Sequence, residues 1–233
     1  MSLKLNSSSD LIAVNAHLAE LDAGQRIRWA LDNLPAQHVC SSSFGAQSAA
    51  LLHLLNTAAP GIPVLFVDNG FLFPETYEFA NQLTQRFRLN VLRALPNESM
   101  RWKEDEVAGL QHVGVEAITR YNQIHKVEPM QRLLDQLQAG TWIAGLRRAQ
   151  SHSRSELDFL QRKGGRWKVN PLADWTDRTI GRYLQQHDLP YHPLWEQGYV
   201  SIGDRHLTQA LMPGELPEQT RFFGLKRECG LHE

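Results

Sequence analysis

The sequence predicts an α/β fold in which a twisted parallel sheet carries helices on both faces. Four short apolar runs, which begin at Val39 and span 62–67, 90–93 and 141–145, have the length and composition of buried strands. Stretches of helical length separate them, and such connections are right-handed crossovers between parallel strands. Two of the loops that follow these strands carry hydroxyl or basic side chains. A ligand site is therefore expected at the carboxyl ends of the strands.

Helix signals fill the segments between the strands. Asp10 can cap a helix that ends near Glu20, and Asp22 can cap a second helix that ends near Leu34. The residues before Asp10, 1–9, are expected to form a disordered tail.

Further helices are expected in the central part of the chain. An apolar stretch over 46–58 has the length of a buried helix, and Pro74 suits the first turn of a helix that runs to Phe87. The pattern over 97–138 is also helical, with an interruption at residues 126–129.

The remaining chain divides into a hairpin, one helix and a tail. Segments 157–160 and 166–170 predict a hairpin around two glycines, and Thr176 can cap a helix over 177–187. The last segment has little periodicity. We therefore expect a nucleotide-binding α/β domain over 1–205 and a flexible C-terminal tail over 206–233.

Composition limits the class of protein. The 233 residues are 42% hydrophobic and 21% charged, which is ordinary for a globular enzyme, and the net charge of −1 argues against general binding to nucleic acid or membranes. The apolar runs are too short to span a bilayer, and the polar start lacks a signal-peptide core. Two cysteines cannot supply a four-cysteine cluster or metal site, so no metal is expected. The cytoplasm is the expected location.

Three serines and a glycine follow the first strand. Ser41, Ser42, Ser43, Phe44 and Gly45 lead into the apolar helix, where unpaired backbone N–H groups and the helix dipole favour an anion. The glycine allows the backbone to approach a ligand closely. The alternative is a serine-rich turn that only caps a core helix.

A basic loop follows the fourth strand. It carries Arg147 and Arg148, with Arg154 further on, and guanidinium groups suit phosphate or sulfate because their donors fork onto two oxygens. If the strand order is 3-2-1-4, this loop and the serine loop flank one crevice. The alternative is a solvated surface loop.

Cys229 is the candidate nucleophile. It lies beside Lys226 and Arg227 and close to His232, and nearby cations favour the thiolate form that attacks, although Glu228 acts in the opposite direction. The alternative is a bystander cysteine. Cys40, in the apolar first strand, is expected to be a small core residue.

Two other residues fit more than one role. Lys126 could bind an anion or be a surface charge, and Asp68 could hold a metal or a ribose hydroxyl or simply close a turn. The ten histidines show no metal-ligand spacing.

Five motifs together resemble the assimilatory phosphoadenylyl-sulfate reductases. They occur in the family's order and cover nearly everything after the first twenty residues: Ser-Ser-Ser-Phe-Gly (41–45), Val-Asp-Asn-Gly (67–70), Lys-Val-Glu-Pro (126–129), Gly-Leu-Arg-Arg-x-Gln-Ser (145–151) and Lys-Arg-Glu-Cys-Gly-Leu-His (226–232). The resemblance implies an adenine nucleotide α-hydrolase-like fold, related to the ATP pyrophosphatases, and a homodimer. It also implies reduction of 3′-phosphoadenylyl sulfate to sulfite and adenosine 3′,5′-bisphosphate for cysteine biosynthesis, with thioredoxin or glutaredoxin as electron donor.

The resemblance also implies roles for individual residues. Cys229 takes the sulfonate as a cysteine S-sulfonate, and Arg147, Lys126 and Arg221 hold the phosphosulfate end. The whole set expected to bind substrate is Ser41, Ser42, Ser43, Phe44, Gly45, Gln47, Asp68, Lys126, Gly145, Arg147, Arg148, Arg221 and His232.

Departures from related families sharpen this interpretation. Ser42, Ser43 and Ala46 replace the glycine pair and aspartate of the ATP-pyrophosphatase loop, which weakens an ATP-cleaving function. No cysteine occurs around Val127 or Ser201, where adenylyl-sulfate reductases carry cluster ligands, so an iron–sulfur cluster is not expected.

Other functions remain open at this point. Asn69 stands where the reductase family commonly has threonine, and is expected to tune rather than abolish function. The rival enzyme class is an ATP-pyrophosphatase-type adenylating enzyme. A nucleotide-sensing module, with Cys229 as a redox switch, is the rival of a different class.

Overall fold

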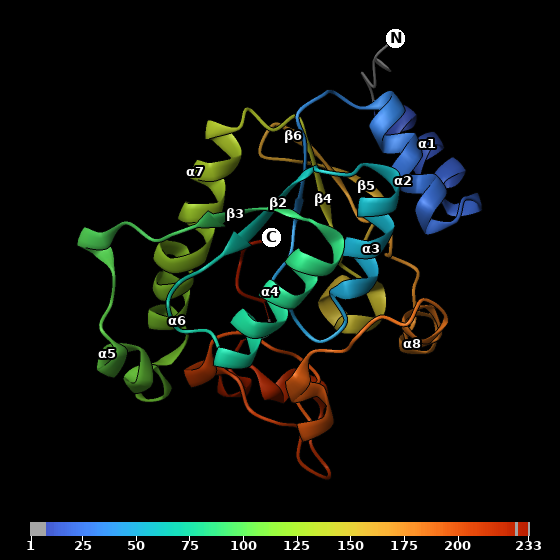
Figure 1. The fold of residues 1–233 in the computed structure, drawn as a ribbon. Coiled ribbons are helices and arrows are strands. Elements are labelled where there is room, and N and C mark those ends of the chain that lie inside the picture. The colour runs from blue at the N-terminus through green and yellow to red at the C-terminus, as the bar shows by residue number, and fades with distance from the viewer. Residues whose placement is uncertain (1–7, 227, 233) are drawn as a thin grey trace.

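The protein is built on a six-stranded sheet with the order β3-β2-β1-β4-β6-β5 (Figure 1). The computed structural model describes residues 8–226 and 228–232. All neighbouring strands are parallel except β5 and β6, which are antiparallel. The strands are β1 (His38–Ser41), β2 (Pro63–Val67), β3 (Asn90–Ala94), β4 (Thr141–Ala144), β5 (Leu160–Lys163) and β6 (Arg166–Val169). The expected order 3-2-1-4 is confirmed, because β1 lies between β2 and β4.

The predicted hairpin forms, and it also extends the sheet. β6 pairs in parallel with β4, with Trp142 beside Lys168, and β5 closes the edge. The local sequence predicted the hairpin but not its place in the sheet, because strand pairing between distant segments has no local signal.

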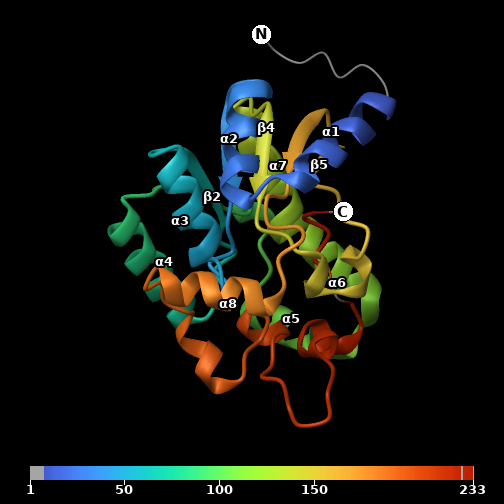
Figure 2. The same ribbon diagram turned by 90° about the vertical axis from the view of Figure 1, so that its right-hand side faces the viewer.

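Helices cover both faces of the sheet, as predicted (Figures 1 and 2). Cys40, Val64 and Ile143 point to one face, which packs against α1, α2, α3, α4 and α8. Val39 and Trp142 point to the other face, which packs against α7. The helices are α1 (Ser8–Glu20), α2 (Ala23–Asn33), α3 (Ala49–Ala58), α4 (Pro74–Phe87), α5 (Glu104–Ala108), α6 (Gly114–Asn122), α7 (Glu128–Gln136) and α8 (Asp177–Gln186).

Local capping signals located several helices well. Asp22 forms a capping box with Gln25 at the start of α2, and Thr176 accepts a hydrogen bond from the backbone N–H of Thr179 in α8. α4 has the predicted bounds. α1 begins at Ser8 rather than Asp10, so Ser8 and Ser9 are helical and not part of a tail; residues 1–7 lie outside the described residues.

The apolar helix α3 begins later than expected. Its predicted start, residues 46–48, forms a turn in which the N–H of Ser48 donates to the carbonyl of Gly45 at 3.1 Å. The helix proper starts at Ala49. The serine loop therefore extends to Ser48, so residues 46–48 belong to the loop and not to the helix as predicted.

The predicted interruption at 126–129 is not a break in the helix. A π-helical turn, Gln123–Val127, joins α6 directly to α7, and Pro129 follows this turn at the start of α7. Such π turns often occur at functional sites, and this one carries Lys126.

The C-terminal part of the chain packs across one end of the sheet. Most of the orange and red chain after α8 lies at the bottom of Figures 1 and 2, at the ends of the strands, and the terminal segment runs back up to the point marked C. Phe222 is fully buried in a second apolar cluster with Leu207 and Tyr121, and Leu231 packs against the face that α7 covers. The domain boundary at 205 and the mobility of 206–233 stay predictions.

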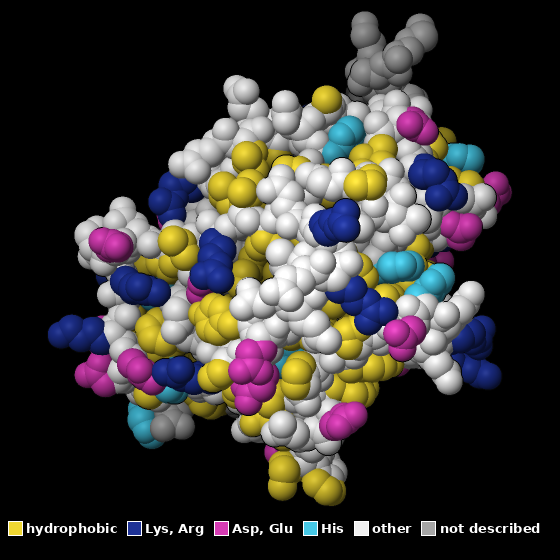
Figure 3. Space-filling model, viewed as in Figure 1, with side chains coloured by type: hydrophobic (Ala, Val, Ile, Leu, Met, Phe, Trp, Pro, Cys, Tyr) yellow, Lys and Arg dark blue, Asp and Glu magenta, His cyan; other side chains and the backbone are white. Residues whose placement is uncertain are grey.

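The surface carries charges of both signs. Figure 3 shows Lys and Arg interspersed with Asp and Glu over one face, in keeping with the net charge of −1. None of the described helices has the length and apolar character needed to cross a membrane.

Candidate functional site

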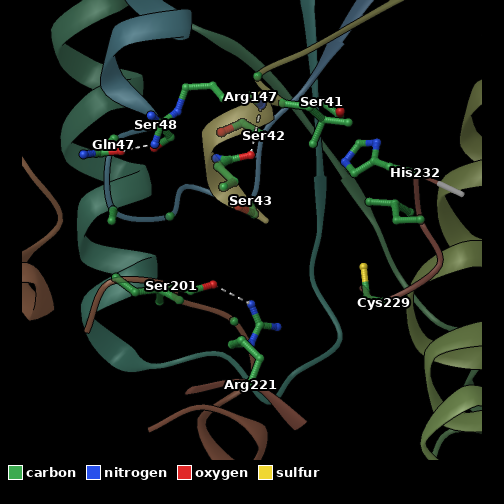
Figure 4. Close-up of a pocket in the computed structure, with 18 of the residues that line it drawn as sticks. Ser41, Ser42, Ser43, Gln47, Ser48, Arg147, Ser201, Arg221, Cys229 and His232 are labelled. Atoms are coloured by element: carbon green, nitrogen blue, oxygen red, sulfur yellow. Dashed lines mark hydrogen bonds between the residues drawn. The ribbon is translucent and has the colours of Figure 1, made fainter. Parts of the chain in front are cut away.

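A cavity of about 410 Å³ opens at the carboxyl ends of the central strands. Its walls include the serine loop after β1, the loop after β4, residues 200–204 and the C-terminal tail, and the π-helical turn adds Lys126. Figure 4 shows the serine loop and Arg147 on one side, with Cys229 and His232 on the other. The crevice predicted between the serine and arginine loops is present.

The serine loop is held by hydrogen bonds within the loop and from the neighbouring strand β4. Ser42 Oγ accepts from the backbone N–H of Phe44 at 3.1 Å, and Ser41 Oγ accepts from the indole N–H of Trp142 at 2.7 Å. Phe44 adopts a left-handed backbone conformation, with φ of 48°, and its ring packs edge-on against Phe66 in the core. The side chain of Phe44 therefore fixes the loop to the core and does not line the cavity.

Arg147 is buried in the cavity wall between α3 and α8. Its guanidinium donates to Gln47 Oε1 at 2.6 Å, to Asp177 Oδ1 at 2.9 Å and to the carbonyl of Trp175 at 3.3 Å. These contacts fix the plane of the guanidinium beside the serine loop. Its charge is then available to an anion at that loop, because Asp177 is largely exposed to solvent.

Two other predicted residues lie outside the cavity lining. Arg148 donates to the carbonyl of Leu157 and stacks over Phe159. Asp68 accepts from the hydroxyl of Tyr77 at 2.6 Å and pairs with Arg93 at 3.3 Å.

Lys126 and Arg221 reach the cavity from the opposite side to Arg147. Arg221 Nη1 donates to Ser201 Oγ at 3.4 Å, as Figure 4 shows, and its Nε has no partner among the described residues. Its guanidinium lies so close to Gly203 that any side chain there would collide with it. Lys126 forms an ion pair of 2.6 Å with Asp204.

Asp204 is a buried carboxylate at the centre of a polar network. It accepts from Asn69 Nδ2 at 2.8 Å and from the hydroxyl of Tyr121 at 3.0 Å, besides Lys126. Burial by itself raises the pKa of Asp204, but the charges of Lys126 and Arg221 outweigh burial and hold this pKa below its usual value. Asp204 is therefore an anion that keeps two cations at the cavity.

The terminal segment, residues 228–232, closes the remaining side. Cys229 is partly buried and lines the cavity together with His232, whose ring stacks on Trp142 with centroids 5.1 Å apart. Glu228 anchors the segment through Arg154 at 2.5 Å and through the hydroxyls of Ser151 and Ser153, each at 3.2 Å.

Burial and neighbouring groups together set the protonation of Glu228 and His232 in this segment. Burial raises the pKa of Glu228, but Arg154 and the two serine hydroxyls outweigh it, so this carboxyl titrates below its usual range. Burial, and then the charges of Lys168 and Arg154, lower the pKa of His232 well below its usual value. His232 therefore enters the cavity as a neutral imidazole at pH 7.

The structure brings most of the predicted residues together. Those that line the cavity are Ser41, Ser42, Ser43, Gly45, Gln47, Lys126, Gly145, Arg147, Arg221, Cys229 and His232. Sequence reasoning missed Ser48, Asp204 and, as a tail anchor, Glu228. Asp204 lies in a stretch without periodicity, whereas Glu228 directly precedes Cys229 and could have been found there.

The cavity combines a thiol with fixed cations and a loop rich in backbone and hydroxyl donors. Within residues 8–226 and 228–232, no group of three or more His, Cys, Asp or Glu side chains could hold a metal ion. Cys40 is buried in β1, and burial raises the pKa of its thiol to about 12, so Cys229 is the accessible thiol. This arrangement suits nucleophilic attack by Cys229 on an anionic ligand.

Comparisons with known proteins agree with this geometry. A family model described as the phosphoadenosine phosphosulfate reductase domain matches residues 37–210. The chain is 55% identical to the phosphoadenosine 5′-phosphosulfate reductase of Xylella fastidiosa, over 96% of this chain and 94% of the relative. It is 54% identical to the protein of that name from Xanthomonas euvesicatoria, over 100% of this chain and 96% of the relative.

Structural comparison gives two informative neighbours. The phosphoadenylyl-sulfate reductase of Candida auris, solved as a phosphate complex, matches with a TM-score of 0.73 and 25% identity, over 88% of this chain and 98% of that one. The FMN adenylyltransferase of Candida glabrata matches with a TM-score of 0.58 and 16% identity, over 94% and 74%. The second match concerns the fold alone, and it agrees with the adenine nucleotide α-hydrolase-like fold.

Proposed function

The chain belongs to the phosphoadenosine phosphosulfate reductase family, and on this basis we propose that it reduces 3′-phosphoadenylyl sulfate to sulfite and adenosine 3′,5′-bisphosphate in sulfate assimilation. The observation that carries the proposal is the position of Cys229. Its side chain faces a cavity that also holds the serine loop, Arg147 and Arg221. A sulfated nucleotide with several negative groups fits such a cavity, because its charges meet fixed cations.

We assign the phosphate groups of the ligand to the serine loop and Arg147, and the sulfonate to Lys126 and Arg221. The hydroxyls of the serine loop suit phosphate oxygens, as do its backbone N–H groups other than those of Ser42, Phe44 and Ser48, which donate within the protein, and Arg147 offers a planar fork of donors beside them. Lys126 and Arg221 lie across the cavity, where they can hold the sulfonate end. His232, neutral at pH 7, can donate or accept one hydrogen bond there.

The first chemical step is transfer of the sulfonate to Cys229. The thiolate of Cys229 attacks the sulfonate sulfur, a new S–S bond forms, and the S–O bond to the nucleotide phosphate breaks. Adenosine 3′,5′-bisphosphate leaves with the electron pair of that bond. The fixed cations offset the repulsion between thiolate and sulfonate, which would otherwise oppose the approach of two anions.

The second step needs an external dithiol, for which we propose thioredoxin or glutaredoxin. One thiolate of the dithiol attacks Cys229 Sγ, and sulfite leaves with the electron pair of the S–S bond. The second thiol of the donor resolves the mixed disulfide, so the donor ends as a disulfide and Cys229 as a thiolate. The tail over 206–233 must open for this step, as a lid that alternates between two positions.

The remaining features of the proposal follow from the resemblance. We expect a homodimer in the cytoplasm, no iron–sulfur cluster, and a role in cysteine biosynthesis. Substrate contacts for Phe44, Asp68 and Arg148 receive no support from their positions outside the cavity lining.

One experiment tests the function and separates it from its rivals. The purified chain is incubated with 3′-phosphoadenylyl sulfate without any dithiol, and Cys229 should gain one SO3 group by mass. Added thioredoxin should then release sulfite and restore the original mass, and Cys229→Ser should bind the nucleotide without forming the adduct. Release of pyrophosphate from ATP would instead support an adenylating enzyme, and binding without an adduct a sensing module.

A further inference from the structure

Lys168 is a buried charge on the face of the sheet that α7 and the terminal segment cover. In register across the sheet, it lies between Trp142 of β4 and Gln161 of β5, and its side chain shares the face of Val39 and Trp142. Only 1% of Lys168 is exposed. A lysine is rarely buried to this degree without a functional or structural partner.

The terminal segment covers Lys168. Its ammonium donates to the carbonyl oxygen of His232 at 3.2 Å and lies 5.1 Å from the centre of the Trp142 ring. His232 stacks on the same indole. Lys168 and Trp142 therefore both contact His232, near the end of the terminal segment.

No carboxylate among the described residues forms an ion pair with Lys168. Glu228, whose charge acts on Lys168, is already bonded to Arg154. The groups that face Lys168 are Lys163 from β5, Arg154 from the loop after β4, and Glu228, Cys229 and His232 from the tail. An anionic Cys229 is the one further negative charge that these groups could provide.

Burial is the main cause that lowers the pKa of Lys168 to about 7, and Lys163 and Arg154 lower it further. Glu228 and Cys229 act in the opposite direction. A negative charge on Cys229 therefore favours the ammonium, and by linkage the ammonium favours a negative charge on Cys229.

We propose that Lys168 is a positioning residue for sulfonate transfer, which holds the terminal segment through the His232 carbonyl and stabilises negative charge on the Cys229 sulfur. The inference rests on the proposed function. Lys168 does not line the cavity and is not expected to touch the nucleotide. Lys168 acts on the terminal segment that carries the attacking thiol, whereas Arg147 and Arg221 act on the ligand.

The first test separates positioning from binding. Lys168→Met keeps the length and burial of the side chain but removes the donor and the charge. In single turnovers without dithiol and at saturating substrate, we expect adduct formation to slow about tenfold or more, while the Kd for adenosine 3′,5′-bisphosphate changes less than about twofold. Lys168→Arg should recover part of the rate. Adduct formation at the wild-type rate in Lys168→Met would overturn the proposal.

The second test needs no substitution at Lys168, in case Lys168→Met does not fold. The wild-type pH profile of adduct formation should include a falling limb near pH 7, where Lys168 loses its proton. Lys163→Met removes a neighbouring positive charge, which raises the pKa of Lys168 and should move the falling limb to higher pH. Identical profiles for the wild type and Lys163→Met would contradict the proposal.

These outcomes differ from failure of the proposed function. If the wild type itself forms no S-sulfonate, then the function is wrong and the inference falls with it. If the wild type forms the adduct and neither test shows the expected change, then only the role of Lys168 is wrong.

Discussion

The ammonium of Lys126 lies 2.6 Å from the carboxylate of Asp204, and both groups are buried at the edge of the cavity. Lys126 therefore faces the ligand as half of an ion pair and not as an isolated charge. Asn69 and Tyr121 donate to the same carboxylate, so its orientation is set by three side chains besides its own backbone. A cation held in this way is in place before the ligand arrives, which lowers the cost of reorganisation.

Asp204→Asn should be strongly destabilising. It leaves the Lys126 ammonium buried without its counter-charge, which typically costs about 3–5 kcal/mol. Unfolding in urea measures the loss. Asp188→Asn is the matched control, because Asp188 pairs with Arg86 at the surface and is fully exposed. Equal free energies of unfolding for Asp204→Asn and Asp188→Asn would show that the buried ion pair contributes no more to stability than the exposed one.

Stability should fall as pH drops from about 6.5 to about 4. Burial lowers the pKa of both His192 and His125 to about 4, so the unfolded chain binds more protons than the folded protein in this window. The free energy of unfolding therefore rises with pH between these values and is independent of these two groups above about pH 7.

His192→Asn tests this pH dependence. Removing one of the two groups should make the slope of stability against pH shallower between pH 4 and 6.5, measured by urea unfolding. Above pH 7 the wild type and the variant should run parallel, even if the variant is less stable throughout. An unchanged slope below pH 6.5 would show that His192 does not take up a proton on unfolding in this range.

Glu228→Gln should loosen the terminal segment. The substitution removes the charge that Arg154 holds at 2.5 Å, and a charge-assisted hydrogen bond of this kind contributes about 1.5–3 kcal/mol. A bulky thiol reagent should then modify Cys229 about tenfold faster, measured by mass. The signal is specific because Cys40 is buried. Glu215→Gln, also in the tail, should react at the wild-type rate, because the bond of Glu215 recorded among the described residues is a local one to the N–H of Met212.

Arg147 and Arg148 should differ sharply although they are neighbours in the sequence. Arg147→Lys cannot keep the fork of bonds to Gln47, Asp177 and a ligand, and should weaken binding of adenosine 3′,5′-bisphosphate about tenfold or more. Arg148 bonds to the carbonyl of Leu157 away from the cavity, so Arg148→Lys should affect stability more than the Kd. Calorimetric titration measures the Kd of each variant. Equal losses of affinity in Arg147→Lys and Arg148→Lys would show that Arg148 also belongs to the site.

Local signals determined much of the fold. Asp22, Pro74 and Thr176 located the starts of α2, α4 and α8, because capping and the fixed φ of proline act within a few residues. The strand order around β1 also followed from the sequence, since right-handed crossovers leave few arrangements.

The site was predicted where chemistry is concentrated in short motifs. The serine loop, Arg147 and Cys229 are recognisable because each places a reactive or anion-binding group next to a second signal. For the serine loop and Arg147 this signal is the end of a predicted strand, and for Cys229 it is the neighbouring basic residues. Phe44 and Arg148 belong to the same motifs, yet their side chains point into the core or away from the cavity. Motif membership does not decide the direction of a side chain.

The sequence by itself therefore determined the α/β class, the order of the central strands, and the set of groups that could bind and attack an anionic ligand. Only the tertiary structure decided that β6 joins β4, that Asp204 pairs with Lys126, and that Lys168 lies beneath the terminal segment. The reason is the range of the interactions. Caps, turns and periodicity act over a few residues, whereas these three contacts join segments far apart in the chain, and no local pattern of residues specifies which distant segment lies opposite.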